Sequence, residues 1–366
     1  MVISTQTHKI GDCIELLRNV HADSIDVVIT SPPYYMLRDY GVDGQIGMEP
    51  TVGEYHDRLL AVTSEIKRVM KPSGVLFWNH GDSYGGHQGR GKGKGNERDQ
   101  MILQKKPGAK CLMMQNERLI MRMIDEHGFI LRNRIIWNKS NGMPSSVSDR
   151  FSNKYEPIYM LVKREKYWFD LDTVRVDGSV ITKARQSKPT DCYGNGSVSG
   201  ETARYAVGIH HAGKNPGDVW TIPTHPYPES HFATFPPDLI EPLIKAACPA
   251  EICPVCGHIR ERIVKKEVIS PRTTNGIKNS NTKYYVTRCG DAVKNTVGWT
   301  SCDCNGGWVS GTVLDPFCGS GTVLEVCRKL NRNAIGFELN PNYEPLIRKR
   351  SMAHTPPLET FCNQEK

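Results

Sequence analysis

The feature that most constrains the fold is a glycine-rich segment, Asp315-Pro-Phe-Cys-Gly-Ser-Gly-Thr322, which lies between a short β-branched run and an amphipathic stretch. Residues 311–314 predict a strand, and residues 320–330 predict a helix. Gly319 and Gly321 allow a tight turn and a close approach of the backbone to a ligand. The first turn of the helix adds N–H groups that have no intrahelical partner. This order of strand, turn and helix predicts a nucleotide-cofactor pocket in an α/β sheet.

A second predicted strand at residues 333–337 ends at Glu338, which lies 23 positions after Asp315. In dinucleotide-binding folds an acidic residue about 20 positions downstream of the turn accepts hydrogen bonds from ribose hydroxyls. Glu338 is therefore the candidate ribose ligand. A glycine turn alone occurs in many surface loops, and it is the combination with the second strand and the acid that favours a cofactor site.

The second informative segment lies near the N-terminus, where residues 24–30 predict a buried strand that runs into Ser31-Pro-Pro-Tyr34. Pro32 and Pro33 fix two φ angles and remove two N–H donors, so the carbonyls beside them point in fixed directions. Such a corner can direct carbonyl oxygens at an amino group. Ser31 adds a hydroxyl acceptor and Tyr34 adds a flat ring for stacking. The alternative is an edge strand that ends at prolines beside a buried tyrosine.

Together these two segments resemble the motifs of the amino-group DNA methyltransferases, which use S-adenosylmethionine to methylate N4 of cytosine or N6 of adenine. The proline motif precedes the glycine motif, as in the permuted beta group of that family. Shorter matches lie at residues 8–12, 134–137, 149–151 with Glu156, and 231–237. The resemblance covers most of the chain and implies a Rossmann-like, doubly wound α/β methyltransferase core in permuted order.

The resemblance also implies roles for the proline corner. Ser31 and the Pro32 carbonyl would accept hydrogen bonds from the amino group, Pro33 would complete the rigid turn, and Tyr34 would stack on the base. An exocyclic amine is a weak nucleophile because its lone pair is delocalised into the ring, so acceptors on its hydrogens both localise and aim that lone pair. Transfer would be direct, and the base would be flipped out of the duplex. Serine at position 31 favours N4 of cytosine, and N6 of adenine is the alternative.

On the cofactor side, the resemblance implies that residues 231–237 close over the methionine end of S-adenosylmethionine. The candidate cofactor-binding residues are Asp12, Phe232, Thr234, Asp315, Phe317, Gly319, Gly321, Thr322 and Glu338.

The charge balance favours a nucleic-acid partner, here double-stranded DNA. Lys and Arg number 47 against 39 Asp and Glu, for a formal charge of +8. Much of the excess lies in the glycine-rich stretch 85–110, which predicts a loop that contacts phosphates, although a solvated charge run without a partner has the same composition. Residues 170–225 lie where the family places target recognition. The alternative for them is a passive surface excursion.

Four cysteines suggest a metal site, because Cys253-Pro-Val-Cys256 is followed by Cys302-Asp-Cys304. Two such turns can supply the four thiolates of a tetrahedral structural zinc site. Cys289 and His258 are candidate substitutes, and unligated thiols in a loop-rich insertion are the alternative.

These motifs divide the chain into a catalytic half at 1–169, a recognition region at 170–225, a cofactor half at 226–248 and 312–350, a cysteine-rich insertion at 249–311 and a tail at 351–366. No signal peptide or transmembrane run is evident, so a cytoplasmic protein of a prokaryotic cell or phage-infected host is expected, with no membrane partner. A cognate restriction nuclease is a candidate partner, and nothing in the sequence fixes the oligomeric state. Two other functions compete with DNA methylation: methylation of RNA or of a protein amide, and zinc-dependent DNA binding without catalysis.

Overall fold

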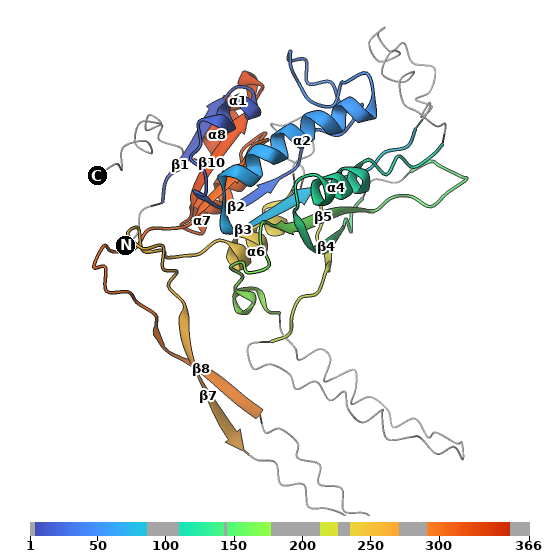
Figure 1. Cartoon of the computed structure of the whole chain (residues 1–366). Coiled ribbons are helices and arrows are strands. Elements are labelled where there is room, and N and C mark those ends of the chain that lie inside the picture. Colours follow the sequence, from blue (N-terminus) through green and yellow to red (C-terminus); the bar gives the residue numbers. More distant parts are fainter. Residues whose placement is uncertain are drawn as a thin grey trace, which may run out of the picture.

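An eight-stranded sheet with helices on both faces forms the core of the computed structural model (Figure 1), which describes residues 4–85, 110–142, 145–176, 213–225, 235–270 and 291–351. Its strands lie in the order β1-β10-β9-β2-β3-β5-β4-β6, and β5 runs antiparallel to both of its neighbours while the other pairs are parallel. The strands are β1 (Gln6–Ile10), β2 (Ile25–Thr30), β3 (Met70–Asn79), β4 (Ile130–Asn138), β5 (Tyr155–Val162), β6 (Val219–Thr221), β9 (Thr312–Asp315) and β10 (Asn333–Glu338).

The permuted order is visible in the sheet, because the C-terminal strands β9 and β10 lie between the N-terminal strands β1 and β2. Two side-chain hydrogen bonds join β2 to β9. The Asp26 carboxylate accepts from the Thr312 amide at 2.9 Å, and the Thr30 hydroxyl donates to Asp315 at 2.7 Å. The two sequence motifs, some 285 positions apart, therefore follow adjacent strands.

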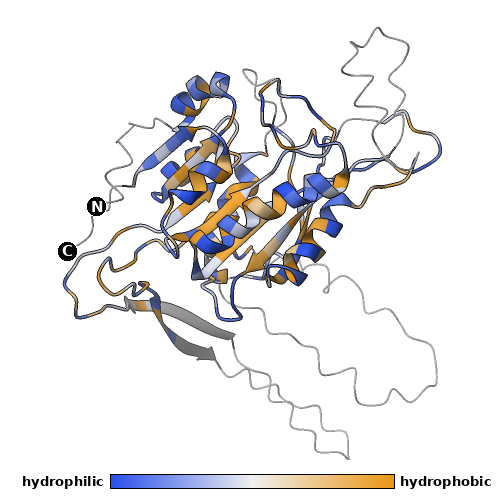
Figure 2. Ribbon diagram, turned by 45° about the horizontal axis from the view of Figure 1, so that its top comes forward, coloured by the Kyte–Doolittle hydropathy of each residue, from blue (hydrophilic) through white to orange (hydrophobic). Residues whose placement is uncertain are grey.

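The helices cover the two faces of the sheet with separate apolar clusters, as a doubly wound fold requires. Helices α1 (Cys13–Arg18), α2 (Val52–Val69) and α4 (Gln115–Asp125) pack on one face, and α6 (Pro237–Ala247), α7 (Thr322–Lys329) and α8 (Glu344–Ser351) contribute to the other cluster. Short 3₁₀ helices are η1 (Leu171–Val174) and η3 (Pro341–Tyr343). Figure 2 shows the apolar residues concentrated on the central strands and on the helix faces turned toward them.

Helix α2 shows how local signals start an element. Thr51 accepts from the Glu54 amide and the Glu54 carboxylate accepts from the Thr51 amide, a capping box that starts the helix at Val52. An apolar stripe along this helix, from Tyr55 to Val69, is buried. Its burial against the sheet supplies most of the stability of a helix of this length.

Strand β3 is irregular near its start. The strand begins at Met70, and between the pairs Ile25↔Met70 and Val27↔Val75 it contains more residues than β2 does. The extra residues form a bulge that accommodates Pro72, which has no N–H to donate to a regular ladder.

The cysteine-rich insertion leaves the core after α6 and returns at β9. Its antiparallel strands β7 (Arg262–Ser270) and β8 (Asp291–Trp299) form a separate two-stranded sheet that projects from the core (Figure 1). At its base Ile252 and Val309 exchange backbone hydrogen bonds, and the Gly311 amide donates to the Pro249 carbonyl. The two ends of the insertion are thus paired where they meet the core.

Several predicted features lie outside the described residues: most of the basic stretch 85–110, the central part of the recognition region 170–225, Phe232, Thr234, Cys289 and the tail from residue 352. Within the described part of the chain, no helix combines the length and apolar character needed to cross a membrane.

Candidate active site

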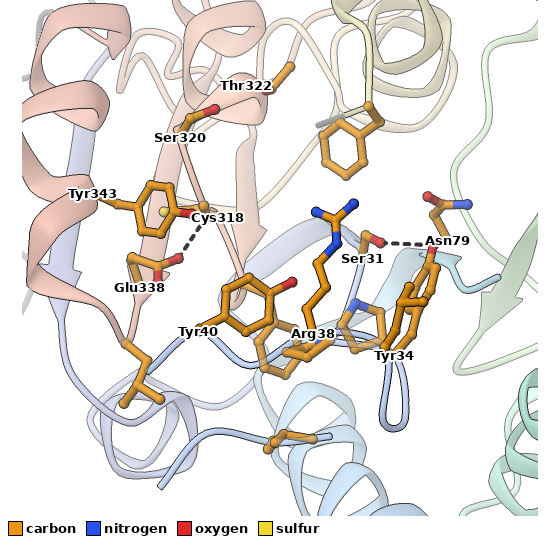
Figure 3. Close-up of a pocket in the computed structure, with 18 of the residues that line it drawn as sticks. Ser31, Tyr34, Arg38, Tyr40, Asn79, Cys318, Ser320, Thr322, Glu338 and Tyr343 are labelled. Carbon is orange, nitrogen blue, oxygen red and sulfur yellow. Dashed lines mark hydrogen bonds between the residues drawn. The ribbon is translucent and has the colours of Figure 1, made fainter. Parts of the chain in front are cut away.

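A cavity of about 860 Å³ lies at the carboxyl ends of the central strands (Figure 3). Its position follows from the topology. From β2 the chain passes through α2 to β3 on one side, and from β9 it passes through α7 to β10 on the other. Connections that diverge from two adjacent parallel strands leave a crevice between them, which is where open α/β sheets bind ligands. The size is that of a small-molecule or cofactor site.

The cavity has two walls, each carrying one of the sequence motifs. The glycine-loop side consists of residues 11–13, 316–320, 322, 338–340 and 343. The proline-corner side consists of Ser31, Pro32, Pro33, Tyr34, Asn79, Trp137, Lys139, Asn141, Asn153 and Glu156. The cavity lining further includes residues of the stretch 37–46 and Phe235. Both sets of predicted residues therefore converge on one space.

The glycine-loop side is organised around Glu338 at the end of β10. One carboxylate oxygen accepts from the Gly319 amide at 2.9 Å, and the other accepts from the Asn340 amide at 2.9 Å. Gly319 and Gly321 have φ angles of 54° and 84°, in the left-handed region that glycine adopts most easily. Burial raises the pKa of the Glu338 carboxyl. Each oxygen keeps a lone pair with which it can accept from a ligand hydroxyl.

Asp315 holds this loop from behind and does not line the cavity. Its Oδ1 accepts from the Thr30 hydroxyl and from the Phe317 amide at 3.1 Å, while its buried Oδ2 has no hydrogen-bond partner among the described residues. Burial raises the pKa of this carboxyl to about 7. Gly321 also lies outside the lining, as the residue that precedes α7.

The other described candidates on this side, Asp12, Phe317, Gly319, Thr322 and Glu338, line the cavity. Sequence reasoning missed two aromatic residues here, Tyr40 and Tyr343 (Figure 3). Burial and the nearby Glu338 charge raise the pKa of Tyr343 to about 12. Its signal was the run Asn340-Pro-Asn-Tyr343 directly after the second strand, where the Asn340 side chain caps η3. Tyr40 had no comparable local signal.

On the proline-corner side, Tyr34 is fixed by its hydroxyl. That oxygen donates to Glu156 at 3.2 Å and lies 3.4 Å from the Ser31 hydroxyl, and Lys139 forms an ion pair with the second oxygen of Glu156. Burial and the Glu156 charge keep the pKa of Tyr34 well above its ordinary value, so the phenol stays neutral. The ring packs closely on Gly81, where a Cβ would lie 2.7 Å from a ring carbon.

A buried chain of hydrogen bonds supports the corner from below. The Tyr55 hydroxyl donates to the Pro33 carbonyl at 2.8 Å and lies 3.0 Å from Nε2 of His80. The indole N–H of Trp78 points to Nδ1 of His80 at 3.4 Å, which places the imidazole proton on Nε2. Burial lowers the pKa of His80 to about 3, so the ring remains neutral. Tyr55 thus fixes the direction of the Pro33 carbonyl from inside the protein.

The four predicted cysteine ligands also come together, at the base of the insertion. The sulfur atoms of Cys253, Cys256, Cys302 and Cys304 all lie within 4.8 Å of one another. A tetrahedral zinc ion with Zn–S bonds of about 2.3 Å needs sulfurs about 3.8 Å apart, so this donor set fits with a small contraction. His258 is not among these four ligands, and its Nε2 lies 3.1 Å from the Thr300 hydroxyl.

This fold and two-walled site define a Rossmann-like transferase core in permuted order, and comparison with known proteins identifies its family. The DNA methylase model of the N6/N4 type matches residues 25–251 and 300–349. The chain belongs to this family of N4/N6-type DNA methyltransferases.

Its similarity to individual relatives extends over almost the whole chain. It is 33% identical to the Type II methyltransferase M.XycI of Xanthomonas campestris pv. cyanopsidis, over 93% of this chain and 85% of that protein. It is 32% identical to M.Cfr9I of Citrobacter freundii, over 91% and 83%. Among solved structures, the PvuII DNA methyltransferase, described as cytosine-N4-specific, aligns with a TM-score of 0.54 at 19% identity, over 99% of this chain and 92% of that one. At that identity the match shows the fold alone.

Proposed function

We propose that this protein transfers a methyl group from S-adenosylmethionine to the exocyclic amino group of a base flipped out of double-stranded DNA, with N4 of cytosine as the favoured target. The convergence of the glycine-loop side and the proline-corner side on one cavity carries this proposal. The Thr30–Asp315 hydrogen bond joins the strands that end at the two walls, so the walls are held in register with each other.

The glycine-loop side is suited to hold the cofactor. Glu338 would accept hydrogen bonds from the ribose hydroxyls, and Phe317 and Tyr343 would flank the adenine ring. Thr322 and Asp12 line the same wall, while Asp315 and Gly321 would act indirectly by shaping the loop. Phe232 and Thr234 keep the role that the family resemblance gives them, closure over the methionine end. When bound, the cofactor supplies an electrophilic methyl group on a sulfonium sulfur.

The proline-corner side is suited to hold the amino group. The Ser31 hydroxyl and the Pro32 carbonyl would accept hydrogen bonds from its two N–H groups, which concentrates the lone pair and aims it toward the other wall. Once the nitrogen has gained the methyl group, one of these two protons would be released. Pro33 fixes the turn, and Tyr34, held by Glu156, offers its ring to the base. These roles require no covalent enzyme intermediate.

Serine at position 31 supports cytosine, and the alternative target is N6 of adenine. Both candidate target bases can be tested by mass spectrometry of nucleosides digested from the DNA of cells that express the chain. The expected product is N4-methylcytosine, at a much lower level in cells expressing Ser31→Ala. N6-methyladenine would overturn the choice of base. Methylation of RNA or protein in parallel assays, with none in DNA, would overturn the function.

The Type II relatives support a place in restriction and modification within a bacterial cytoplasm, beside a nuclease of the same specificity. DNA methylated by this chain would then resist cleavage at the modified sequence. If nucleases that recognise that sequence cut methylated and unmethylated DNA equally well, the protective role would be wrong.

We further propose that Cys253, Cys256, Cys302 and Cys304 bind one structural zinc ion. The geometry of the four sulfurs supports this. The ion would cross-link the two ends of the insertion next to β9. Elemental analysis should find about one zinc per chain, and Cys256→Ser should lower that content and the melting temperature. Cys111→Ser, at an exposed cysteine outside the cluster, is the control. A wild-type protein that contains no zinc and has the same melting temperature as Cys256→Ser would exclude the site.

A further inference from the structure

Phe151 is the feature of the described surface that the proposed function leaves unexplained. Its side chain is 97% exposed, more than any other large apolar residue of the described part of the chain. It lies two positions before Asn153 and five before Glu156, and both of those residues line the proline-corner side of the cavity. A ring so exposed contributes nothing to the core, and its position in the chain close to two cavity-lining residues leaves it free to contact a ligand that approaches the site.

The backbone around Phe151 is anchored although the ring is not. The Arg150 guanidinium lies 3.7 Å from the centre of the Tyr84 ring and donates to the Phe151 carbonyl at 3.1 Å. The Tyr84 hydroxyl donates in turn to Asn153 at 3.3 Å. The residues on either side of Phe151 therefore contact Tyr84, while the Phe151 side chain itself remains exposed to solvent.

The charges around this segment fit a nucleic acid. Arg150 and Lys154 flank Phe151 in sequence, and Lys154 is exposed. Asp149, the acidic residue of this segment, is paired with Lys110 at 2.8 Å, whereas Lys139 is paired with Glu156 and is not counted among these cations. An exposed ring between cations is suited to a partner that presents phosphates outside and stacked rings inside, which describes a DNA duplex.

We propose that Phe151 is the wedge that enters the base stack where the target nucleotide leaves it. A flipped base leaves a gap between its former neighbours, and an apolar side chain inserted there offsets part of the lost stacking. The segment lies on the wall that takes up the base, so one approach of the duplex would bring the ring to the gap and the base to Ser31. This inference rests on the proposed function and assigns a further residue to it.

The test compares Phe151→Ala with the wild type on two duplexes that carry the sequence methylated in expressing cells. One duplex is fully paired, and in the other the target base faces an abasic position, so that flipping costs little. The alanine variant should lose roughly 10- to 100-fold in kcat/KM on the paired duplex and roughly 3-fold or less on the other, because a wedge matters only when the base must be unstacked from a pair. Phe151→Trp should retain most activity on both.

Val147→Ala is the matched control, since Val147 is an exposed apolar residue of the same segment, at 37%. It should leave both rates within roughly 2-fold of the wild type, within the range of ordinary surface substitutions. A second readout is the fluorescence of 2-aminopurine placed beside the target base, which rises on unstacking. The rise on binding should be smaller with Phe151→Ala than with Val147→Ala.

Equal losses on the two duplexes would overturn the wedge, because the ring would then contact DNA away from the gap. No loss on either duplex would also overturn it, because the ring would then contribute nothing to methylation. Should the alanine variant fail to fold, Phe151→Trp and Phe151→Leu carry the same comparison, with the leucine variant expected to lose more on the paired duplex than on the abasic one. A wild type that methylates no DNA would instead overturn the proposed function itself.

Discussion

The two walls of the cavity are built in different ways. The glycine-loop side comes mainly from one unit, residues 315–343, in which a strand, a turn, a helix and a second strand follow one another. The proline-corner side is assembled from four separate segments, which supply Ser31, Asn79, Lys139 and Glu156. Local chain geometry thus shapes the first wall, whereas side-chain hydrogen bonds between distant segments shape the second.

This difference predicts that substitutions separate into two classes. Changes in the glycine-loop side should weaken cofactor binding and leave turnover at saturating cofactor nearly unchanged. Changes in the proline-corner side should lower turnover and leave cofactor binding intact. A variant that lowered cofactor affinity and turnover to the same extent would show that the two walls do not act independently.

The largest effect is expected from Ser31→Ala, which removes a hydroxyl acceptor of the amino group. Loss of one preorganised hydrogen bond at a reacting group costs roughly 100- to 1,000-fold in kcat. Single-turnover methylation of the cognate duplex would measure this, and calorimetric titration with S-adenosylmethionine should give an unchanged Kd. A weakened Kd with normal turnover would place Ser31 on the cofactor side.

The hydrogen bond that joins the walls gives a pH-dependent effect through Asp315. The carboxyl has an ordinary pKa of 3.8 and a folded-state pKa of about 7. Between these values the folded state holds a proton that the unfolded state has lost, so stability should fall by about 2–4 kcal/mol as pH rises from about 4 to 7. Above pH 7 this contribution is constant.

Asp315→Asn keeps the carbonyl acceptor for Thr30 and Phe317 but cannot ionise, so that fall should be reduced in the variant. Urea unfolding of both proteins across this pH range measures the two slopes. Identical slopes would mean that Asp315 does not titrate as its burial implies.

On the glycine-loop side, Glu338→Gln replaces a carboxylate by an amide of the same shape. Hydrogen bonds to a charged group contribute more than neutral ones, so the Kd for S-adenosylmethionine should rise roughly 10- to 100-fold. Turnover at saturating cofactor should stay close to that of the wild type. A normal Kd would remove Glu338 from the ribose site.

The smallest effect is expected from Tyr55→Phe, which deletes the hydroxyl that holds the Pro33 carbonyl. The corner loses one neutral hydrogen bond, so kcat should fall roughly 3- to 10-fold with no change in cofactor affinity. Tyr35→Phe is the matched control, because Tyr35 is also buried but donates to the Pro50 carbonyl, outside the proline corner. Equal losses in the two variants would reduce the Tyr55 effect to general stability.

The contrast between the walls also explains what the sequence could predict. The strand, glycine turn and acid of the first wall have fixed local spacing, so Phe317, Gly319 and Glu338 could be placed on the cavity before the structure was known. The doubly wound fold and its permuted order followed from the family resemblance that the same two motifs carry. Asp315 was expected to contact the ligand, but its carboxylate faces Thr30 behind the loop, because hydrogen bonds across β2 and β9 decide its direction.

The residues that hold the proline-corner side in place could not be predicted from the sequence in the same way. Tyr55 belongs to the buried stripe of α2, and nothing in that stripe distinguishes a tyrosine that holds a carbonyl from one that only packs. His80 and Lys139 carry no local spacing signal either, since their partners, Tyr55 on α2 and Glu156 on β5, come from other parts of the chain. Phe151 lay within a motif that the resemblance identified, but its exposure depends on how Arg150 and Tyr84 pack.

The central claim is that one cavity holds the cofactor on its glycine-loop side and an unpaired base on its proline-corner side. A crystal structure with S-adenosylhomocysteine and a cognate duplex tests it most directly. The expected result places the ribose at Glu338 and the exocyclic amine of a flipped base within hydrogen-bond distance of the Ser31 hydroxyl and the Pro32 carbonyl, facing the cofactor sulfur. A base that remained stacked in the duplex, or an amine bound away from Ser31 and Pro32, would contradict it.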